Sequence, residues 1–560
     1  MAIGSTSSEA HNPHPTWVRW LLPSVGDLLF AAFLILLAFT ALSVRLLGDA
    51  GIGWHIRTGQ LILATHAIPR ADPFSSSTAG QSWFAWEWLY DVIVGWLDRA
   101  AGLNGVVLFT ALTIALVFSW TFRLLLHRGT NFPLALILVL LAASAAMIHF
   151  LARPHVVSWL FTVAWFWILE STERNGCGSD LEKRGRKDEH TGSRRNWPLW
   201  LLPLLMVVWV NVHGGFLFGF ALLGIYWLSA AWQWFTSKGE SFEDVLSAIE
   251  AGKRAKELAF MGILSALATF VNPYGWRLHL HIYRYLSNRF LMDHIDEFQS
   301  PNFHYIAQKC FAGLLLLTLV ALAANRREGS LSQSLVVLFA VFSGLYASRN
   351  IPASALLLIL AIGPWLSDAM ERLADRPVRI RWRPLAFARF LRRMRAIESS
   401  LRGHLWPIAA IAFACGIAAH GGKLADTPFM DAHFDDKRFP VEAVSYIEKR
   451  DLGVPVLTPD SWGGYLIYRL YPRVKVVVDD RHDLYGQQFL ESYLKMMHAE
   501  PGWDDFLREH EVQCALVPKN SALANLLTET PSWKKIYEDN VAIAFDRTPN
   551  SIGASTVIPQ

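Results

Sequence analysis

The feature that most constrains this chain is a series of long apolar stretches separated by short polar ones. A helix needs about 20 apolar residues to cross the hydrocarbon of a membrane, and within lipid a helix satisfies its own backbone hydrogen bonds. Charged residues make up only 18% of the chain, against roughly 25% in soluble domains. The apolar stretches lie at residues 22–47, 103–126, 133–150, 155–170, 197–211, 216–236, 257–272, 308–325, 331–348, 351–367 and 405–421. The sequence therefore predicts an α-helical polytopic membrane protein with about eleven spans.

Basic loops predict how these spans are oriented. Residues 171–196 and 368–402 are rich in Lys and Arg, and such loops remain in the cytoplasm. The expected location is the inner (plasma) membrane of a bacterial cell, with the chemistry on the outer face. The predicted parts are a cytoplasmic tail (1–21), a multi-span domain (22–425) with a large first outer loop (48–102), an extracytoplasmic domain (426–548) and a disordered tail (549–560).

The extracytoplasmic region has the pattern of an α/β domain. Short buried strands are predicted at Val454–Leu457, Val474–Val478, Cys514–Val517 and Val541–Phe545, with helices at 440–450, 486–498 and 503–510. Alternating strands and helices favour a parallel or mixed sheet. The charged run Asp479–Asp483 follows a predicted strand, where α/β domains often bind ligands, although a solvated loop explains it equally well.

Polar residues near the predicted outer surface are the candidates for a functional site. The segment Gly48–Gln60 follows the first span directly and carries Asp49, His55 and Arg57. Unpaired charge is costly beside a membrane, so polar groups retained there are candidates for function. The other candidates on this side are Glu87 in a Trp-rich stretch, Asp72 before a proline, and Arg153, His155, His213 and Arg349 at the corners between spans.

Each candidate also has a simpler structural interpretation. Asp49 can cap a helix, and His55 and Arg57 can face lipid headgroups. An Asp-Pro pair such as Asp72-Pro73 is typical of a turn, and Arg153 can extend its charged end to the interface. The residue types alone leave both interpretations open.

The layout of a first span, an acidic residue and a long outer loop resembles the GT-C glycosyltransferases. In that family the loop also carries interfacial helices, and Trp83–Tyr90 is similar to one. In the tail, Asp460–Ile467 followed by Val476–Arg481 resembles the Trp-Trp-Asp-Tyr-Gly region of oligosaccharyltransferase catalytic subunits. Gly463 and Gly464 stand where that motif has Trp and Asp. The chain therefore lacks the aspartate that would recognise an acceptor sequon, which argues against protein N-glycosylation.

The resemblance implies a GT-C-like membrane glycosyltransferase. Such an enzyme moves a sugar from a polyprenyl-phosphate carrier to an acceptor at the outer face. Asp49 maps to the catalytic base, with Glu87 as a second catalytic or acceptor-binding acid. The departing phosphate needs positively charged or hydrogen-bonding groups, and the rigid guanidinium group of arginine suits this role. The residues expected to bind the lipid phosphate or the substrate are His55, Arg57, Asp72, Arg153, His155, His213 and Arg349.

The expected partners are a polyprenyl-phosphate-linked sugar, membrane lipids and an unidentified acceptor, with no nucleic acid. No cofactor is expected, and no Asp-x-Asp or Glu-x-Asp motif near Asp49 indicates a divalent metal. Two other classes of function remain open. A membrane scaffold would use the outer domain to hold a partner and would not need Asp49. A lipid or solute transporter would show charged or broken helices deep in the membrane and internal repeats.

Overall fold

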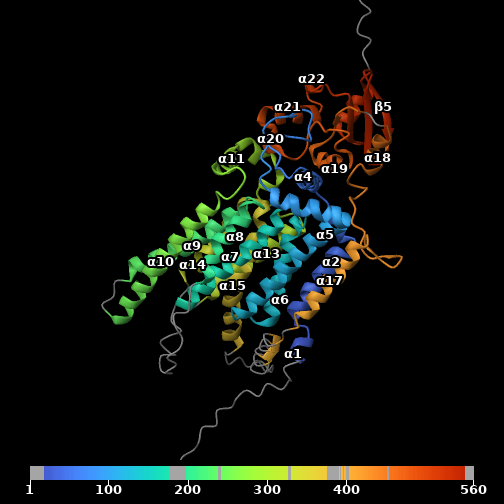
Figure 1. Ribbon diagram of the computed structural model, residues 1–560. Coiled ribbons are helices and arrows are strands. Elements are labelled where there is room, and N and C mark those ends of the chain that lie inside the picture. Colours follow the sequence, from blue (N-terminus) through green and yellow to red (C-terminus); the bar gives the residue numbers. More distant parts are fainter. Residues whose placement is uncertain are drawn as a thin grey trace, which may run out of the picture. The chain divides into compact units, whose positions relative to one another are not determined.

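The computed structural model of the chain contains two compact units (Figure 1). The residues that the structure describes are 18–176, 197–237, 241–325, 330–374, 390, 393–394, 397–398, 401, 403–450 and 453–548. The first unit comprises residues 1–36, 111–149 and 301–417, and the second comprises residues 37–110, 150–300 and 418–560. Residues 1–17 of the predicted cytoplasmic tail (1–21), the predicted tail 549–560 and most of the two basic loops lie outside the described residues.

The first unit is a helical bundle. Its helices are α1 (Val18–Leu21), α2 (Val25–Ala38), the second part of α5 (Trp88–His127), α6 (Phe132–Ala146), η1 (Met147–His149), α13 (Ile306–Ala324), α14 (Leu331–Tyr346), η4 (Ser348–Asn350), α15 (Ile351–Ala374) and α17 (Leu405–Ala419). Helix α15 is the core, because it packs on α6, α13 and α14 and buries its apolar run from Ala355 to Ile362. Arg123 of α5 is paired with Asp27 of α2, with 2.5 Å between Nη2 and Oδ1, as charge within an apolar bundle requires.

The second unit contains the remaining helices of the multi-span region. They are α3 (Leu42–Leu46), α4 (Gly51–Thr65), the first part of α5, α7 (His155–Gly176), η2 (Trp197–Trp200), α8 (Leu201–Val210), α9 (Phe216–Thr236), α10 (Phe242–Ala268), α11 (Trp276–Ser287), α12 (Arg289–His294) and η3 (Asp296–Phe298). Helices α9 and α10 pack side by side and contact α8 (Figure 1). Gly102 divides α5, because its positive φ of 60° breaks the helix there.

The C-terminal part of the second unit is the predicted α/β domain. Its elements are β1 (Lys423–Leu424), β2 (Thr427–Pro428), α18 (Val441–Arg450), β3 (Val456–Leu457), α19 (Asp460–Leu470), α20 (His482–Tyr485), α21 (Gln487–Met497), α22 (Trp503–Glu509), β4 (Cys514–Pro518), α23 (Ala522–Glu529), β5 (Trp533–Glu538) and β6 (Ala542–Arg547). The four-stranded sheet has the order β3-β4-β6-β5 and is mixed, since only β3 and β4 are parallel. Buried side chains such as Leu457, Phe506, Val517 and Phe545 form its core.

The predicted fold class is confirmed, and most predicted apolar stretches coincide with helices. However, α5 and α10 each begin 15 residues before the predicted starts at 103 and 257. Among the residues that the structure describes, six helices are long and apolar enough to span a membrane. Three shorter apolar helices accompany them, Pro198–Val210, Leu331–Tyr346 and Leu405–Ala419. Those six are Arg19–Ala38, Trp88–His127, Phe132–His149, Phe216–Thr236, Ile306–Ala324 and Ser348–Leu373. The figure of eleven spans stays a prediction.

Three local predictions are wrong. The stretch 22–47 is not one helix, because the chain leaves helical geometry between α2 and α3. Trp83–Tyr90 is not an interfacial helix: α5 begins only at Trp88, and Trp83 is buried. Residues 474–478 form no regular strand. Val476 forms only isolated bridges, to Val456 and to Ser75, and its carbonyl accepts a 2.8 Å hydrogen bond from the backbone N–H of Ser76. The hydroxyl of Ser77 bonds the carbonyl of Val477.

Candidate functional site

Close packing of α4 on α19 positions the candidate site. A Cβ atom added at Gly53 would overlap the carbonyl of Gly464, and one added at Gly464 would overlap the carbonyl of Ala50. Gly463 is equally constrained, since its Cβ would lie 2.5 Å from the carbonyl oxygen of Val478. The glycine pair of the tail motif therefore lets the helix backbones approach closely, which brings the segment after Val478 to the first turn of α4.

Asp49, Arg153 and Asp480 meet at that turn. Nη1 of Arg153 lies 3.0 Å from Oδ2 of Asp480 and 3.5 Å from Oδ1 of Asp49. The same Asp49 oxygen accepts a hydrogen bond of 2.8 Å from the backbone N–H of Gly51, so Asp49 also leads the chain into α4. Asp49 is 31% exposed and Arg153 is 22% exposed. The two groups can therefore meet a ligand.

Burial and neighbouring charges shift the pKa values of Arg153 and Asp480. Burial lowers the pKa of Arg153, but Asp49, Asp480, Glu297 and Glu87 raise it more, and the guanidinium stays charged. Burial, opposed by Arg153 and reinforced by Asp49 and Asp479, raises the pKa of Asp480 to about 6. Asp480 is therefore a carboxyl group that changes charge near neutral pH.

A second cluster begins with a buried His55–Asp91 pair. Nδ1 of His55 on α4 lies 2.5 Å from Oδ1 of Asp91 on α5, and both side chains are buried. Glycines one helical turn further on explain the contact. A Cβ at Gly59 would overlap the carbonyl of Asp91, and one at Gly95 would lie 2.6 Å from the carbonyl carbon of Gly59. Burial, followed by the positive charge of Arg153, lowers the pKa of His55 well below its usual range, which favours a neutral imidazole.

Glu87 lies between two imidazoles. Its carboxylate oxygens are 3.9 Å from Nε2 of His55 and 3.9 Å from Nε2 of His213. His213 is held from its other side, because Nδ1 lies 2.8 Å from the hydroxyl of Ser158 and accepts a 3.0 Å hydrogen bond from the backbone of Gly215. The ring of His155, at the start of α7, lies 6.4 Å from that of His213. The fold thus gathers Glu87 and three histidines that are distant in sequence.

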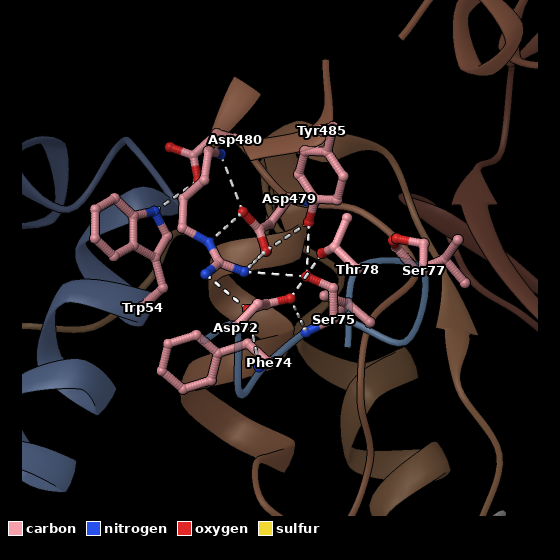
Figure 2. A network of polar contacts seen from close by, with 12 residues as sticks. Trp54, Asp72, Phe74, Ser75, Ser77, Thr78, Asp479, Asp480 and Tyr485 are labelled. Atoms are coloured by element: carbon pink, nitrogen blue, oxygen red, sulfur yellow. Dashed lines mark hydrogen bonds and ion pairs between the residues drawn. The ribbon is translucent and has the colours of Figure 1, made fainter. Parts of the chain in front are cut away.

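Asp72 belongs to a buried network beside the site. Its Oδ1 lies 2.8 Å from Nη1 of Arg481, whose Nη2 is 2.6 Å from Oδ2 of Asp479. The hydroxyls of Ser75, Thr78 and Tyr485 complete the network (Figure 2). Burial raises the pKa of Asp72, but Arg481 and hydrogen bonds from Ser75 and its neighbours outweigh burial and lower it overall. These contacts tie the loop 66–87 to the α/β domain, while the predicted contact of Asp72 with substrate stays a prediction.

Arg57 and Arg349 are the two remaining candidates. Arg57 on α4 donates from Nε to the backbone carbonyl of Tyr468, at 2.8 Å, and from Nη1 to Gln60, at 2.9 Å. It therefore satisfies a carbonyl in the last turn of α19, where cations are favourable. Arg349 lies in η4 of the first unit, and its role in binding lipid phosphate stays a prediction.

Asp91 and Trp54 are absent from the predicted site, and Asp480 enters the prediction only as part of the charged run Asp479–Asp483. Asp480 lies within the acidic run that follows a predicted strand, which was a usable signal. Asp91 lies four residues after Glu87, in an apolar helix. An acidic residue in such a helix indicates a functional role. Trp54, which donates its indole N–H to Oδ1 of Asp480 at 2.9 Å (Figure 2), carried no signal in the sequence.

A metal centre is not evident in the described part of the chain. No group of three or more His, Cys, Asp or Glu residues there is arranged to hold an ion. The expectation that no cofactor is required has no test in these observations and stays a prediction.

Comparisons with known proteins identify the fold. Neither a family model nor a curated protein matches the chain. The chain is similar to the oligosaccharyltransferase AglB from Archaeoglobus fulgidus, solved with an inhibitory peptide and a dolichol-phosphate, with a TM-score of 0.54 and 11% identity over 95% of this chain and 75% of AglB. The chain therefore has a GT-C-like fold of a multi-pass membrane protein, as predicted.

Two further structures match with lower TM-scores. ArnT from Cupriavidus metallidurans, bound to undecaprenyl phosphate, gives a TM-score of 0.47 and 15% identity over 95% of this chain and 99% of ArnT. The arabinofuranosyltransferase AftD from Mycobacteria gives a TM-score of 0.46 and 15% identity over 95% of this chain and 42% of AftD.

Proposed function

We propose that the protein is a membrane glycosyltransferase that moves a sugar from a polyprenyl-phosphate carrier to an acceptor hydroxyl at the outer face of the membrane. One observation carries the proposal. A partly exposed carboxylate, Asp49, lies 3.5 Å from the partly exposed guanidinium of Arg153. The resemblance to GT-C glycosyltransferases assigns the catalytic acid to this position. The dolichol-phosphate bound to AglB is consistent with a polyprenyl-phosphate donor.

In the proposed reaction, the oxygen of the acceptor hydroxyl attacks the anomeric carbon of the donor sugar. The bond from that carbon to the phosphate oxygen breaks, and the polyprenyl phosphate leaves with the electron pair. Asp49 accepts the proton of the hydroxyl. One base suffices, because a phosphate leaves without being protonated.

Arg153 supplies the positive charge that the leaving phosphate needs. A guanidinium suits this role, because its planar fork matches two phosphate oxygens. Glu87, with His55 and His213 on either side, lies near enough to influence the charge of Arg153 and serves in this proposal to bind the acceptor or the sugar.

Replacing Asp49 tests the proposed function. A strain that lacks the gene would be complemented with wild type or with Asp49→Asn, and its surface glycans and lipid-linked sugars would be compared at equal levels of membrane protein. We expect Asp49→Asn to lose the product and accumulate the lipid-linked donor. The matched control is Asp431→Asn, which alters an exposed aspartate of the same unit and should complement fully. Full complementation by Asp49→Asn would instead favour the scaffold.

A further inference from the structure

Arg153 is held at one nitrogen only. Nη1 contacts both Asp480 and Asp49, at 3.0 and 3.5 Å. Within the described part of the chain, Nε and Nη2 donate no hydrogen bond. The guanidinium therefore has a fixed end and a free pair of donors. Which of the two carboxylates fixes it decides whether Asp49 remains available as a base.

Asp480 is built to be the fixed partner. The indole N–H of Trp54 holds its Oδ1 at 2.9 Å, while its Oδ2 receives Arg153. Its side chain is only 16% exposed, half the exposure of Asp49. A Cβ atom at Gly51 would overlap both Nη1 of Arg153 and Oδ2 of Asp480. The first turn of α4 therefore leaves room for this ion pair only because residue 51 is a glycine.

We propose that Asp480, supplied by the C-terminal domain, is a positioning residue that keeps Arg153 from moving closer to Asp49 and directs its free donors to the phosphate of the donor. This inference rests on the proposed function. Without Asp480, the nearest carboxylate to Arg153 is Asp49, and their present 3.5 Å contact would shorten into a direct hydrogen-bonded ion pair. That pair would remove the phosphate ligand and the base together. The C-terminal domain would then complete the catalytic site.

The charged groups that face Asp480 give the proposal a pH dependence. Arg153 and Asp49 face it from the helical part of the unit, and Asp479 and His482 face it from its own segment. Because burial raises the pKa of Asp480 to about 6, lowering the pH through 6 protonates it and weakens its hold on Arg153. Acidification should therefore reproduce the effect of Asp480→Asn in the wild-type protein.

A double-mutant cycle tests the inference on the full-length chain in lipid nanodiscs, with undecaprenyl phosphate as the probe. We expect Asp480→Asn to weaken binding about tenfold in the wild-type background, as for the loss of a charge-assisted hydrogen bond. In the Asp49→Asn background the same substitution should leave binding unchanged or tighter, because Arg153 has no carboxylate to fall onto and one nearby anion is gone. Equal weakening in both backgrounds, or none in the first, would overturn the inference.

Two controls separate this inference from the proposed function. Asp483→Asn alters a neighbouring aspartate that is bound to His281 at 3.0 Å, and it should bind the probe like wild type. Arg153→Gln should bind it weakly. If Arg153→Gln binds like wild type, the phosphate role of Arg153 fails and the inference fails with it. If Arg153→Gln is weak but Asp480→Asn is not, only the inference fails. Because the phosphate monoester of the probe also titrates near pH 6, binding to both proteins should weaken between pH 7 and pH 5. The loss should be larger for wild type than for Asp480→Asn.

Discussion

Two arginines of the second unit, Arg153 and Arg481, meet aspartates of the same segment in opposite ways. Arg481 is buried, and it is held by Asp479 through Nε and Nη2 and by Asp72 through Nη1. Its guanidinium also lies 4.7 Å from the ring centre of Trp83. Arg153 is partly exposed and is held through one nitrogen. A buried arginine whose three nitrogens all contact carboxylates builds the framework, while an arginine held through one nitrogen can bind a ligand.

The comparison shows how adjacent residues divide these tasks. Asp479 and Asp480 are neighbours, but Asp479 binds the framework arginine and Asp480 binds the site arginine. The stability of the framework and the function of the site should therefore respond differently to substitution. The predictions below test that separation, in order of decreasing expected effect.

Replacing Arg481 should have the largest effect on stability. Arg481→Gln leaves Asp72 and Asp479 buried without their cation, and removing one partner of a buried ion pair costs about 3–5 kcal/mol. Denaturant unfolding of the purified protein in micelles measures this loss. The matched control is Arg473→Gln, because Arg473 is 56% exposed in its ion pair with Glu448, and exposed pairs contribute ~1 kcal/mol or less. Equal effects of the two substitutions would contradict the comparison.

The glycine contact between α4 and α19 should come next. Gly464→Ala forces the added methyl group against the carbonyl of Ala50, and overpacking of this kind costs roughly 1–3 kcal/mol. The same unfolding experiment measures it. Gly224→Ala, in α9, is the control, since a Cβ there meets nothing within 4 Å and alanine favours a helix. A Gly464→Ala protein as stable as Gly224→Ala would show that the helices can separate without cost.

Asp480→Asn should increase stability, unlike any change at Arg481. Because the pKa of Asp480 is about 6 in the folded protein and near 3.9 in unfolded chains, ionising it at pH 8 disfavours the folded state. The variant should be more stable than wild type at pH 8 by up to about 3 kcal/mol, with a smaller difference at pH 5. Unfolding curves at the two pH values measure the difference. A variant less stable than wild type at pH 8 would place Asp480 in the framework.

The smallest effect expected is the response of the framework to mild acid. The pKa of Asp72 is lowered from its ordinary value of 3.8, so its ion pair stabilises the fold above that value and is lost only as the pH falls through the lowered pKa. The difference in unfolding free energy between wild type and Asp72→Asn should therefore stay constant from pH 7 to pH 5. A difference that shrinks in this range would mean that the framework and the site titrate together.

Most of the fold was predictable, because its signals are local. Apolar stretches such as 216–236 and 331–348 coincide with α9 and α14 within two residues, since length and hydropathy suffice to identify them. The tail was read correctly as α/β for the same reason. The errors arose where tertiary contacts prevailed. Trp83 suggests an interfacial helix by composition, but it packs beneath Arg481 instead.

The site was predictable only in part. Asp49, Glu87, His55, Arg153, His155 and His213 were selected from their types and their places between spans. Asp480 was not selected, because its partners Arg153 and Trp54 are 327 and 426 residues away in sequence. Arg57 was predicted to bind substrate or lipid phosphate. Its Nε donates to the carbonyl of Tyr468 in α19, and the predicted role stays a prediction. One sequence cannot show which charged groups are already satisfied by distant partners.

The sequence by itself determined the membrane class, the order of the apolar helices, the α/β tail and the acidic residue after the first stretch. These properties follow from local hydropathy and spacing. Water and lipid determine where apolar residues and backbone polar groups can lie in any fold. Only the tertiary structure decided which arginine is buried and which remains able to bind a ligand. That choice depends on Gly53, Gly464 and Gly51, whose missing side chains let α4, α19 and the Arg153–Asp480 pair come into contact.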